Sequence, residues 1–189
     1  MRKYLIIGLI VIQAITLVAF FGYQEYKIRT AEYTVKLKTV PVDPVDMMRG
    51  HYAVVQYEIS TLSEEKYNFW NDVTRGSKLK KGDCVYVELI KKGNLAKAAY
   101  FTKKLPIGKL VIKGEIAKVE KKHISDIDPE TKEDYGYNQL IYSIKYDIEK
   151  IFISEAKAKQ VEWANKPYLV TVKVNSGGEA KAMAIEEIK

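Results

Sequence analysis

Cysteine, histidine and arginine are scarce in this chain of 189 residues. The single cysteine, Cys84, rules out an intrachain disulfide. The two histidines, His51 and His123, lie far from each other and from Cys84 in the sequence, so no zinc-ligand spacing occurs. The basic residues are nearly all lysines interspersed with glutamate and isoleucine. This pattern indicates that the net charge of +7 belongs to a solvated surface and not to a nucleic-acid-binding face.

The sequence motifs of the common enzyme classes are also missing. There is no G-x-S-x-G, no H-E-x-x-H, no phosphate-binding loop and no dinucleotide-binding fingerprint. A thiolate–imidazole pair is not expected either, because Cys84 falls on a strand and His123 in a polar segment. We therefore predict a protein that is not an enzyme and that has no cofactor, no metal site and no nucleic-acid partner.

One long apolar run is present, and it lies at the N-terminus. Residues 4–22, YLIIGLIVIQAITLVAFFG, carry no charge and are long enough as a helix to cross a bilayer. A cleaved signal peptide is the alternative, but the exit at Ala19–Gly22 offers no A-x-A-like cleavage site. We predict an uncleaved transmembrane anchor within residues 1–24, in contact with membrane lipid.

The orientation of this anchor is predicted from its flanking charges. Arg2 and Lys3 precede the apolar run and favour a cytoplasmic N-terminus, whereas Lys27 and Arg29 follow it and favour the opposite. We favour a cytoplasmic N-terminus because the N-terminal tail is very short and long domains are translocated across the membrane largely regardless of their charge. The prediction is a single-pass protein of the cell membrane whose C-terminal domain lies outside the cytoplasm.

Residues 25–189 are predicted to form one β-rich domain, an antiparallel and barrel-like sheet with one soluble helix. Residues 32–40 alternate strictly between apolar and polar side chains, which is typical of a half-buried strand. Gly114 marks a bulge or a close backbone approach. The soluble helix is predicted for Glu155–Lys166, between Ser154 as a cap and Pro167. Further strands are predicted at 51–59, 84–91, 95–102, 109–120, 139–148 and 150–154, with a closing hairpin from 167 and a polar loop at 121–138.

The stretch between the first two strands is the one dense cluster of special residues. After Pro41, Asp43 can cap a short helical turn, and Pro44 follows at the first helical position. Asp46 and Arg49 then complement the two ends of the helix dipole, and Gly50 suits a left-handed terminator. A structural corner explains most of this pattern. Arg49 has the alternative of binding a carboxylate or phosphate, or of pairing internally with one of the nearby acids.

The same stretch, DPVDMMRGHYAVVQY, resembles the signature of the GDYXXLXY family. Gly50, Tyr52 and Tyr57 match the motif, whereas His51 replaces the aspartate and Val55 the leucine. The resemblance continues through residues 82–89, 109–116 and 146–162, where Phe152 and Glu155 match family positions, and into the final hairpin. It implies a membrane-tethered bacterial envelope domain of unassigned activity, with neighbouring multi-pass membrane proteins as suspected partners. Glu155 is either the partner that orients Arg49 or an ordinary carboxylate at a helix start.

Three functional hypotheses follow. The first is a non-catalytic, single-pass protein that assembles with a multi-pass membrane partner or an envelope component, with Gln13 and Thr16 as polar groups for helix association. The second is a membrane-bound hydrolase of signal-peptidase-like architecture, which would need Ser60 as nucleophile and a lysine such as Lys80 as base. The third is a small-ligand sensor with a pocket inside the sheet.

Overall fold

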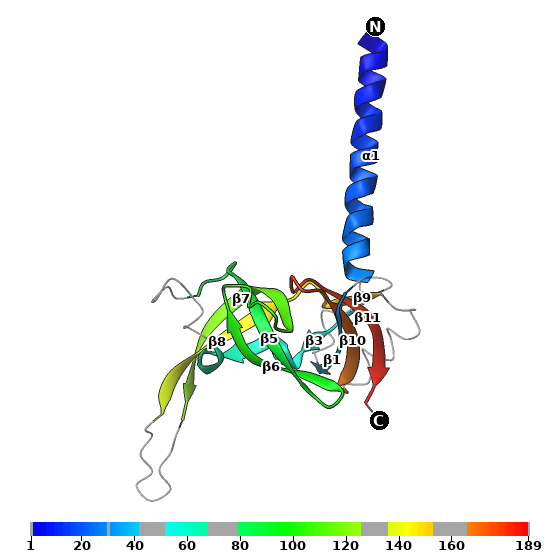
Figure 1. The fold of residues 1–189 in the computed structure, drawn as a ribbon. Coiled ribbons are helices and arrows are strands. Elements are labelled where there is room, and N and C mark those ends of the chain that lie inside the picture. The colour runs from blue at the N-terminus through cyan, green and yellow to red at the C-terminus, as the bar shows by residue number, and fades with distance from the viewer. Residues whose placement is uncertain are drawn as a thin grey trace, which may run out of the picture.

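The long helix α1 (Arg2–Arg29) projects from a β domain in the computed structural model (Figure 1). The structure describes residues 2–29, 31–41, 52–67, 79–125, 136–152 and 166–188. Within α1, the stretch Ile6–Tyr23 is long and apolar enough to cross a membrane, and none of it is buried against the rest of the chain. The predicted N-terminal apolar helix is therefore confirmed, and it continues to Arg29.

The described part of the domain is built from short and medium strands, with the 3-10 turns η2 (Glu58–Ser60) and η3 (Glu64–Lys66) before and after β4. The strands are β1 (Tyr33–Val40), β2 (Tyr52–Val54), β3 (Gln56–Tyr57), β4 (Thr61–Ser63), β5 (Cys84–Lys92), β6 (Leu95–Thr102), β7 (Val111–Ile124), β8 (Tyr137–Lys145), β9 (Lys150–Phe152), β10 (Tyr168–Val174) and β11 (Ala180–Glu187).

Period-two patterning explains which face of each strand is buried. In β1, Val35, Leu37 and Thr39 point into the core while Thr34 is exposed, as the alternation predicts. Strand β5 buries Val85, Val87 and Leu89 in the same way. Its other face carries Cys84, which is exposed. The hairpin predicted for residues 84–102 is present as β5 and β6.

The large sheet curls back on itself. Its strand order is β11-β10-β1-β6-β5-β7-β8-β4, and a bridge between Tyr67 and Phe101 brings the chain that follows β4 back against β6. The path β6-β5-β7-β8-β4 therefore returns to its own start, as predicted for a barrel-like sheet. A separate two-stranded ladder joins β2 to β9.

The core lies inside this curl and is dominated by aliphatic and aromatic side chains. Phe101 is fully buried at its centre, with the rings of Tyr67 and Tyr142 at centroid distances of 5.2 and 5.5 Å. Such offset and edge-on contacts between aromatic rings are favourable beyond the area that they bury. These rings tie the β4 region, β6 and β8 together at the point where the sheet closes.

The predicted mainly β fold is confirmed, but the sheet is mixed and not purely antiparallel. Strands β1 and β6 are parallel at the pair Lys36–Leu95, while the other named strand pairs are antiparallel. Curling a sheet back on itself brings together strands that are distant in the chain. Their relative direction is then decided by the closure and not by a hairpin turn.

The predicted loop 121–138 is also shorter than expected. Strand β7 continues to Ile124 and β8 begins at Tyr137, where the pairs His123–Asn138 and Ile124–Tyr137 extend the ladder. Most of these distal side chains are exposed, so the segment lacks the apolar alternation that marks a strand. The two strands form an arm that projects from the domain (Figure 1). The predicted helix Glu155–Lys166 lies outside the described residues except for Lys166, which is not helical.

Candidate functional site

Two buried tyrosines join the motif segment to the chain that follows β8. Tyr57, at the end of β3, donates its hydroxyl hydrogen to the carbonyl oxygen of Ile148 at 2.7 Å. Tyr146 donates its hydroxyl hydrogen to the carbonyl oxygen of Ile59 at 2.6 Å. Each segment therefore supplies one phenol and one carbonyl to the other. We call this pair of hydrogen bonds the tyrosine clasp.

Further hydrogen bonds of the backbone hold the two segments in the conformation that forms the tyrosine clasp. The N–H of Val55 donates to the carbonyl of Glu149 at 2.8 Å, and the N–H of Tyr57 donates to the hydroxyl of Ser60 at 3.3 Å. On the facing segment, the carboxylate of Glu149 accepts the N–H of Tyr146 at 2.6 Å. Asp147 between them has φ +60°, a left-handed conformation that aspartate adopts more readily than most residues. The result is a tight turn that presents two carbonyls and one phenol.

Electrostatics keep both phenols protonated. Burial raises the pKa of Tyr57 far above its ordinary value, and the negative charge of Glu149 adds to the effect. Burial, again with Glu149 as the second cause, raises the pKa of Tyr146 well above 10. A neutral phenol with a high pKa is a good hydrogen-bond donor but a poor general base. The clasp is therefore suited to holding structure and not to proton transfer.

The predicted site residues divide between the described and undescribed parts of the chain. Tyr57 is in the clasp, Pro41 is exposed directly after β1, and Tyr52 pairs with Phe152 across the β2–β9 ladder. The remaining members of the predicted corner lie outside the described residues: Asp43, Pro44, Asp46, Arg49, Gly50 and Glu155.

Sequence reasoning missed Tyr146 and Glu149 as partners of the motif. A signal was present, because Tyr142, Ile144, Tyr146 and Ile148 continue one buried face beyond the end of β8. That alternation shows that Tyr146 is buried. A buried phenol needs an acceptor, so a carbonyl partner could have been expected, although its position in the sequence could not.

The residues weighed for catalysis are not assembled into a reactive group where the structure describes them. Ser60 is buried and its hydroxyl already accepts the N–H of Tyr57. Lys80 is exposed in the turn before β5, where its backbone N–H donates to Asp83. Among the described residues, no three histidine, cysteine, aspartate or glutamate side chains are grouped as metal ligands would be.

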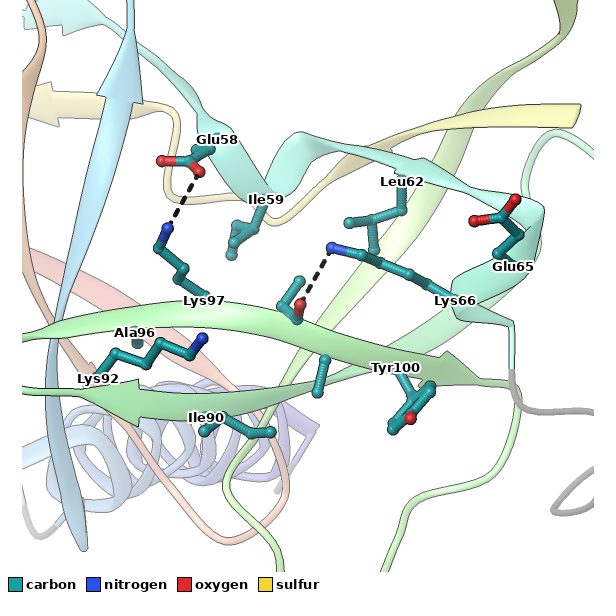
Figure 2. A pocket seen from close by; sticks show the side chains of 12 residues that line it. Glu58, Ile59, Leu62, Glu65, Lys66, Ile90, Lys92, Ala96, Lys97 and Tyr100 are labelled. Carbon is teal, nitrogen blue, oxygen red and sulfur yellow. Dashed lines mark hydrogen bonds and ion pairs between the residues drawn. The ribbon is translucent and has the colours of Figure 1, made fainter. Parts of the chain in front are cut away.

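A groove of about 600 Å³ lies at the seam where the sheet closes, between β6 and the η2–η3 segment. Ile59, Leu62 and Ala98 supply apolar surface within it. Lysines bridge it: the ammonium of Lys66 donates to the Ala98 carbonyl at 3.2 Å, and that of Lys97 lies 4.0 Å from Glu58 (Figure 2). The groove combines apolar surface with three lysines and two glutamates. Its full lining is Glu58, Ile59, Leu62, Glu65, Lys66, Ile90, Lys92, Ala96, Lys97, Ala98, Ala99 and Tyr100.

Comparison with known proteins places the chain in a family. A family model described as "GDYXXLXY protein" matches residues 14–185. The chain belongs to the GDYXXLXY family. No match was found among curated proteins or among solved structures. In this GDYXXLXY protein the matched region begins inside the apolar stretch of α1 and ends in β11. It therefore includes both the second half of the helix and most of the β domain.

The family motif now has a structural explanation at two of its positions. Val55 occupies the leucine position and is 5% exposed, and Tyr57 occupies the last tyrosine position and is 1% exposed. Val55 contributes its backbone N–H to the clasp segment and Tyr57 contributes its phenol. In this member of the GDYXXLXY family, the second half of the motif therefore closes the domain and leaves no reactive group exposed at these two positions.

Proposed function

We propose that this chain is a non-catalytic, single-pass membrane protein whose β domain lies outside the cytoplasm and assembles with a multi-pass membrane partner or an envelope component. The observation that carries the proposal is the surface of α1. Every side chain described between Ile6 and Tyr23 is exposed, so the domain itself covers none of this apolar surface. Lipid tails and the membrane helices of a partner are the surroundings that suit such a helix.

Gln13 is the polar group through which α1 would meet a partner helix. It lies in the middle of the apolar stretch and is exposed. Thr16, the other polar residue there, already donates its hydroxyl hydrogen to the carbonyl of Ile12 at 2.8 Å. An amide side chain in hydrocarbon without a partner is unfavourable, and a hydrogen bond across helices removes that cost.

Affinity purification from detergent-solubilised membranes tests this proposal. We expect the wild-type chain to recover a stoichiometric multi-pass or envelope protein, and Gln13→Leu to recover less of it while remaining in the membrane fraction. Leu17→Ala is the matched control, because it changes an exposed apolar residue of the same helix without removing a polar group. A wild-type chain that elutes as a monomer with no stoichiometric partner would count against assembly.

A second candidate is binding of a small ligand in the groove between β6 and the η2–η3 segment. It is favoured by the apolar surface of that groove together with Lys66, Lys92 and Lys97. Titration of the labelled chain with short-chain fatty acids, followed by two-dimensional NMR, is the corresponding experiment. Shifts confined to Ala96–Tyr100 and Glu58–Lys66 would support a binding site. Shifts scattered over the surface lysines would contradict it.

The hydrolase alternative has the least support. Its nucleophile would have to be exposed and close to a base, whereas Ser60 is buried and is an acceptor for the backbone at Tyr57. Changing Ser60 and Lys80 singly to alanine tests it directly: retained processing of a co-expressed membrane-protein substrate in both variants would remove the hypothesis.

A further inference from the structure

The connection between β6 and β7 exposes two large apolar side chains, while lysines at its two ends form ion pairs. Ile107 is 98% exposed and Leu105 is 42% exposed, with Pro106 between them. A connecting loop more commonly turns apolar side chains inward and leaves charges in water. Exposing an isoleucine forgoes the favourable free energy of removing its apolar side chain from water.

The base of this loop is held on both sides. The ammonium of Lys103 lies 3.0 Å from the carboxylate of Asp83, and that of Lys109 lies 2.9 and 2.8 Å from the two carboxylate oxygens of Glu88. The carbonyl of Leu110 accepts the N–H of Leu89 at 2.9 Å. Gly108 has φ +72°, a conformation that suits glycine at the turn after the apolar tip. The tip Leu105–Ile107 is therefore presented by a fixed base.

The start of β7, shortly after the tip, is linked to the end of the domain from which α1 rises. The N–H of Lys113, near the start of β7, donates to the carbonyl of Gly178 at 2.8 Å. Gly178 lies in the turn that follows β10. The last residue of β10, Val174, pairs with Tyr33, and Tyr33 follows shortly after the end of α1. Figure 1 shows β7 on the upper side of the domain, the side from which the helix rises.

The length of α1 brings that face to the level of a bilayer surface. The apolar stretch ends at Tyr23 and the helix ends at Arg29, six residues or about 9 Å further on. The polar layer on each side of a bilayer is of similar thickness, about 5–8 Å. If α1 spans the hydrocarbon core, the helix-bearing face of the domain lies against the lipid headgroups.

We propose that the tip Leu105–Ile107 inserts into the headgroup boundary of the same bilayer that holds α1. Lys104 is exposed and forms no ion pair among the described residues, so its ammonium is available to anionic lipid headgroups. An apolar tip beside a cation is the combination that binds membrane interfaces. The β domain then contacts the membrane at two points, which limits its rotation about the helix. This inference rests on the proposed retention of α1 in the membrane.

The test uses the full chain in lipid nanodiscs made of phosphatidylcholine and phosphatidylglycerol. In a Cys84→Ser background, Pro106→Cys carries an environment-sensitive fluorophore and leaves Lys104, Leu105 and Ile107 in place, and Asn138→Cys on the projecting arm is the matched control. We expect the label at position 106 to shift to shorter emission wavelengths and to be quenched by lipids that carry a spin label near the headgroup. The label at position 138 is expected to show neither effect.

Ile107→Asp in the Pro106→Cys protein distinguishes insertion of the tip from mere proximity to the bilayer. We expect this change to reduce lipid quenching at position 106 to the level of position 138. Co-elution with the discs reports anchoring by α1 independently, so a chain that fails to enter discs overturns the proposed anchoring and not the loop contact alone. In chains that do enter discs, equal quenching at positions 106 and 138, or quenching that survives Ile107→Asp, would overturn the proposal. A tip that binds a partner protein instead of lipid would give no lipid quenching and would overturn it as well.

Discussion

Tyr57 and Tyr146 hold each other's segments in place, since each donates its phenol to a carbonyl in the segment that carries the other. The two segments are 91 and 87 residues apart at these hydrogen bonds, so the pair closes a long stretch of chain. Because all four groups are buried, breaking either hydrogen bond leaves a carbonyl without its donor.

Removing either phenol is expected to destabilise the domain. Tyr57→Phe and Tyr146→Phe should each lower the free energy of unfolding by about 1–3 kcal/mol, because a buried carbonyl loses its partner while the ring remains. Tyr100→Phe, at an exposed site, should change it by less than about 0.5 kcal/mol. Chemical denaturation of the detergent-solubilised chain measures all three. A Tyr57→Phe variant as stable as Tyr100→Phe would show that the clasp contributes nothing.

The double variant tests whether the two hydrogen bonds act together. Both depend on the same turn at Tyr146–Glu149, so their loss should not be additive, with an interaction energy of about 0.5–3 kcal/mol. Denaturation of the single and double variants closes the thermodynamic cycle. Strict additivity would mean that the two phenols stabilise the fold independently.

Alkaline pH should unfold the protein through the same pair. Burial raises the pKa of both phenols in the folded state above the ordinary value of 10.0, so the folded chain holds protons that the unfolded chain releases. The resulting stability is complete below about pH 10 and falls as the pH rises beyond it. Tyr57→Phe is therefore expected to have a shallower decline of unfolding free energy than the wild type above pH 10. Parallel declines would contradict this cause.

Acid pH should lower the stability of the folded protein through protonation of Asp83. The backbone N–H of Lys80 lowers the pKa of this carboxyl, and the ammonium of Lys103 lowers it further, whereas burial opposes them. Stability from Asp83 is thus present above pH 3.8 and is lost as the pH falls through the lowered folded-state value. Asp83→Asn should reduce stability at neutral pH by less than about 1 kcal/mol, because the Lys103–Asp83 ion pair is partly solvated. The variant should also lose less stability than the wild type as the pH falls below about 4. Glu120→Gln, in an exposed ion pair, is the control.

Gly114 should not tolerate a side chain. A Cβ there would lie 2.5 Å from a methyl carbon of Ile144 and 2.9 Å from the carbonyl oxygen of Lys145. Gly114→Ala is expected to lower the free energy of unfolding by about 1–3 kcal/mol, because β7 and β8 must separate to admit it. At Gly177 the nearest atom is 3.4 Å away, so Gly177→Ala provides a control with little effect. Equal stability of the two variants would refute the close approach.

Local patterns allowed much of this fold to be predicted from the sequence. The alternation in β1 predicted its buried face, the pattern at residues 84–102 predicted a hairpin, and Gly114 predicted a bulge or a close backbone approach. The structure contains the close approach, and the neighbouring strand is β8. The parallel contact between β1 and β6 was not predictable, because a closure between distant strands leaves no local pattern. The groove lined by Lys66 and Lys97 depends on the same closure.

The single cysteine provides a direct test of orientation. Cys84 is exposed on the outer face of β5, so a membrane-impermeant maleimide should label it in intact spheroplasts if the β domain lies outside the cytoplasm. Cys84→Ser controls for nonspecific labelling. Labelling that appears only after the membrane is broken would place the domain inside and reverse the predicted topology.

The intact mass of the chain recovered from washed membranes tests the central claim most directly, namely that α1 is retained as an anchor for a folded β domain. Our account predicts a membrane-bound product that keeps residues 1–22 and has a mass close to the full 21.6 kDa. A mature product that begins beyond Gly22 and is recovered in the soluble fraction would contradict it.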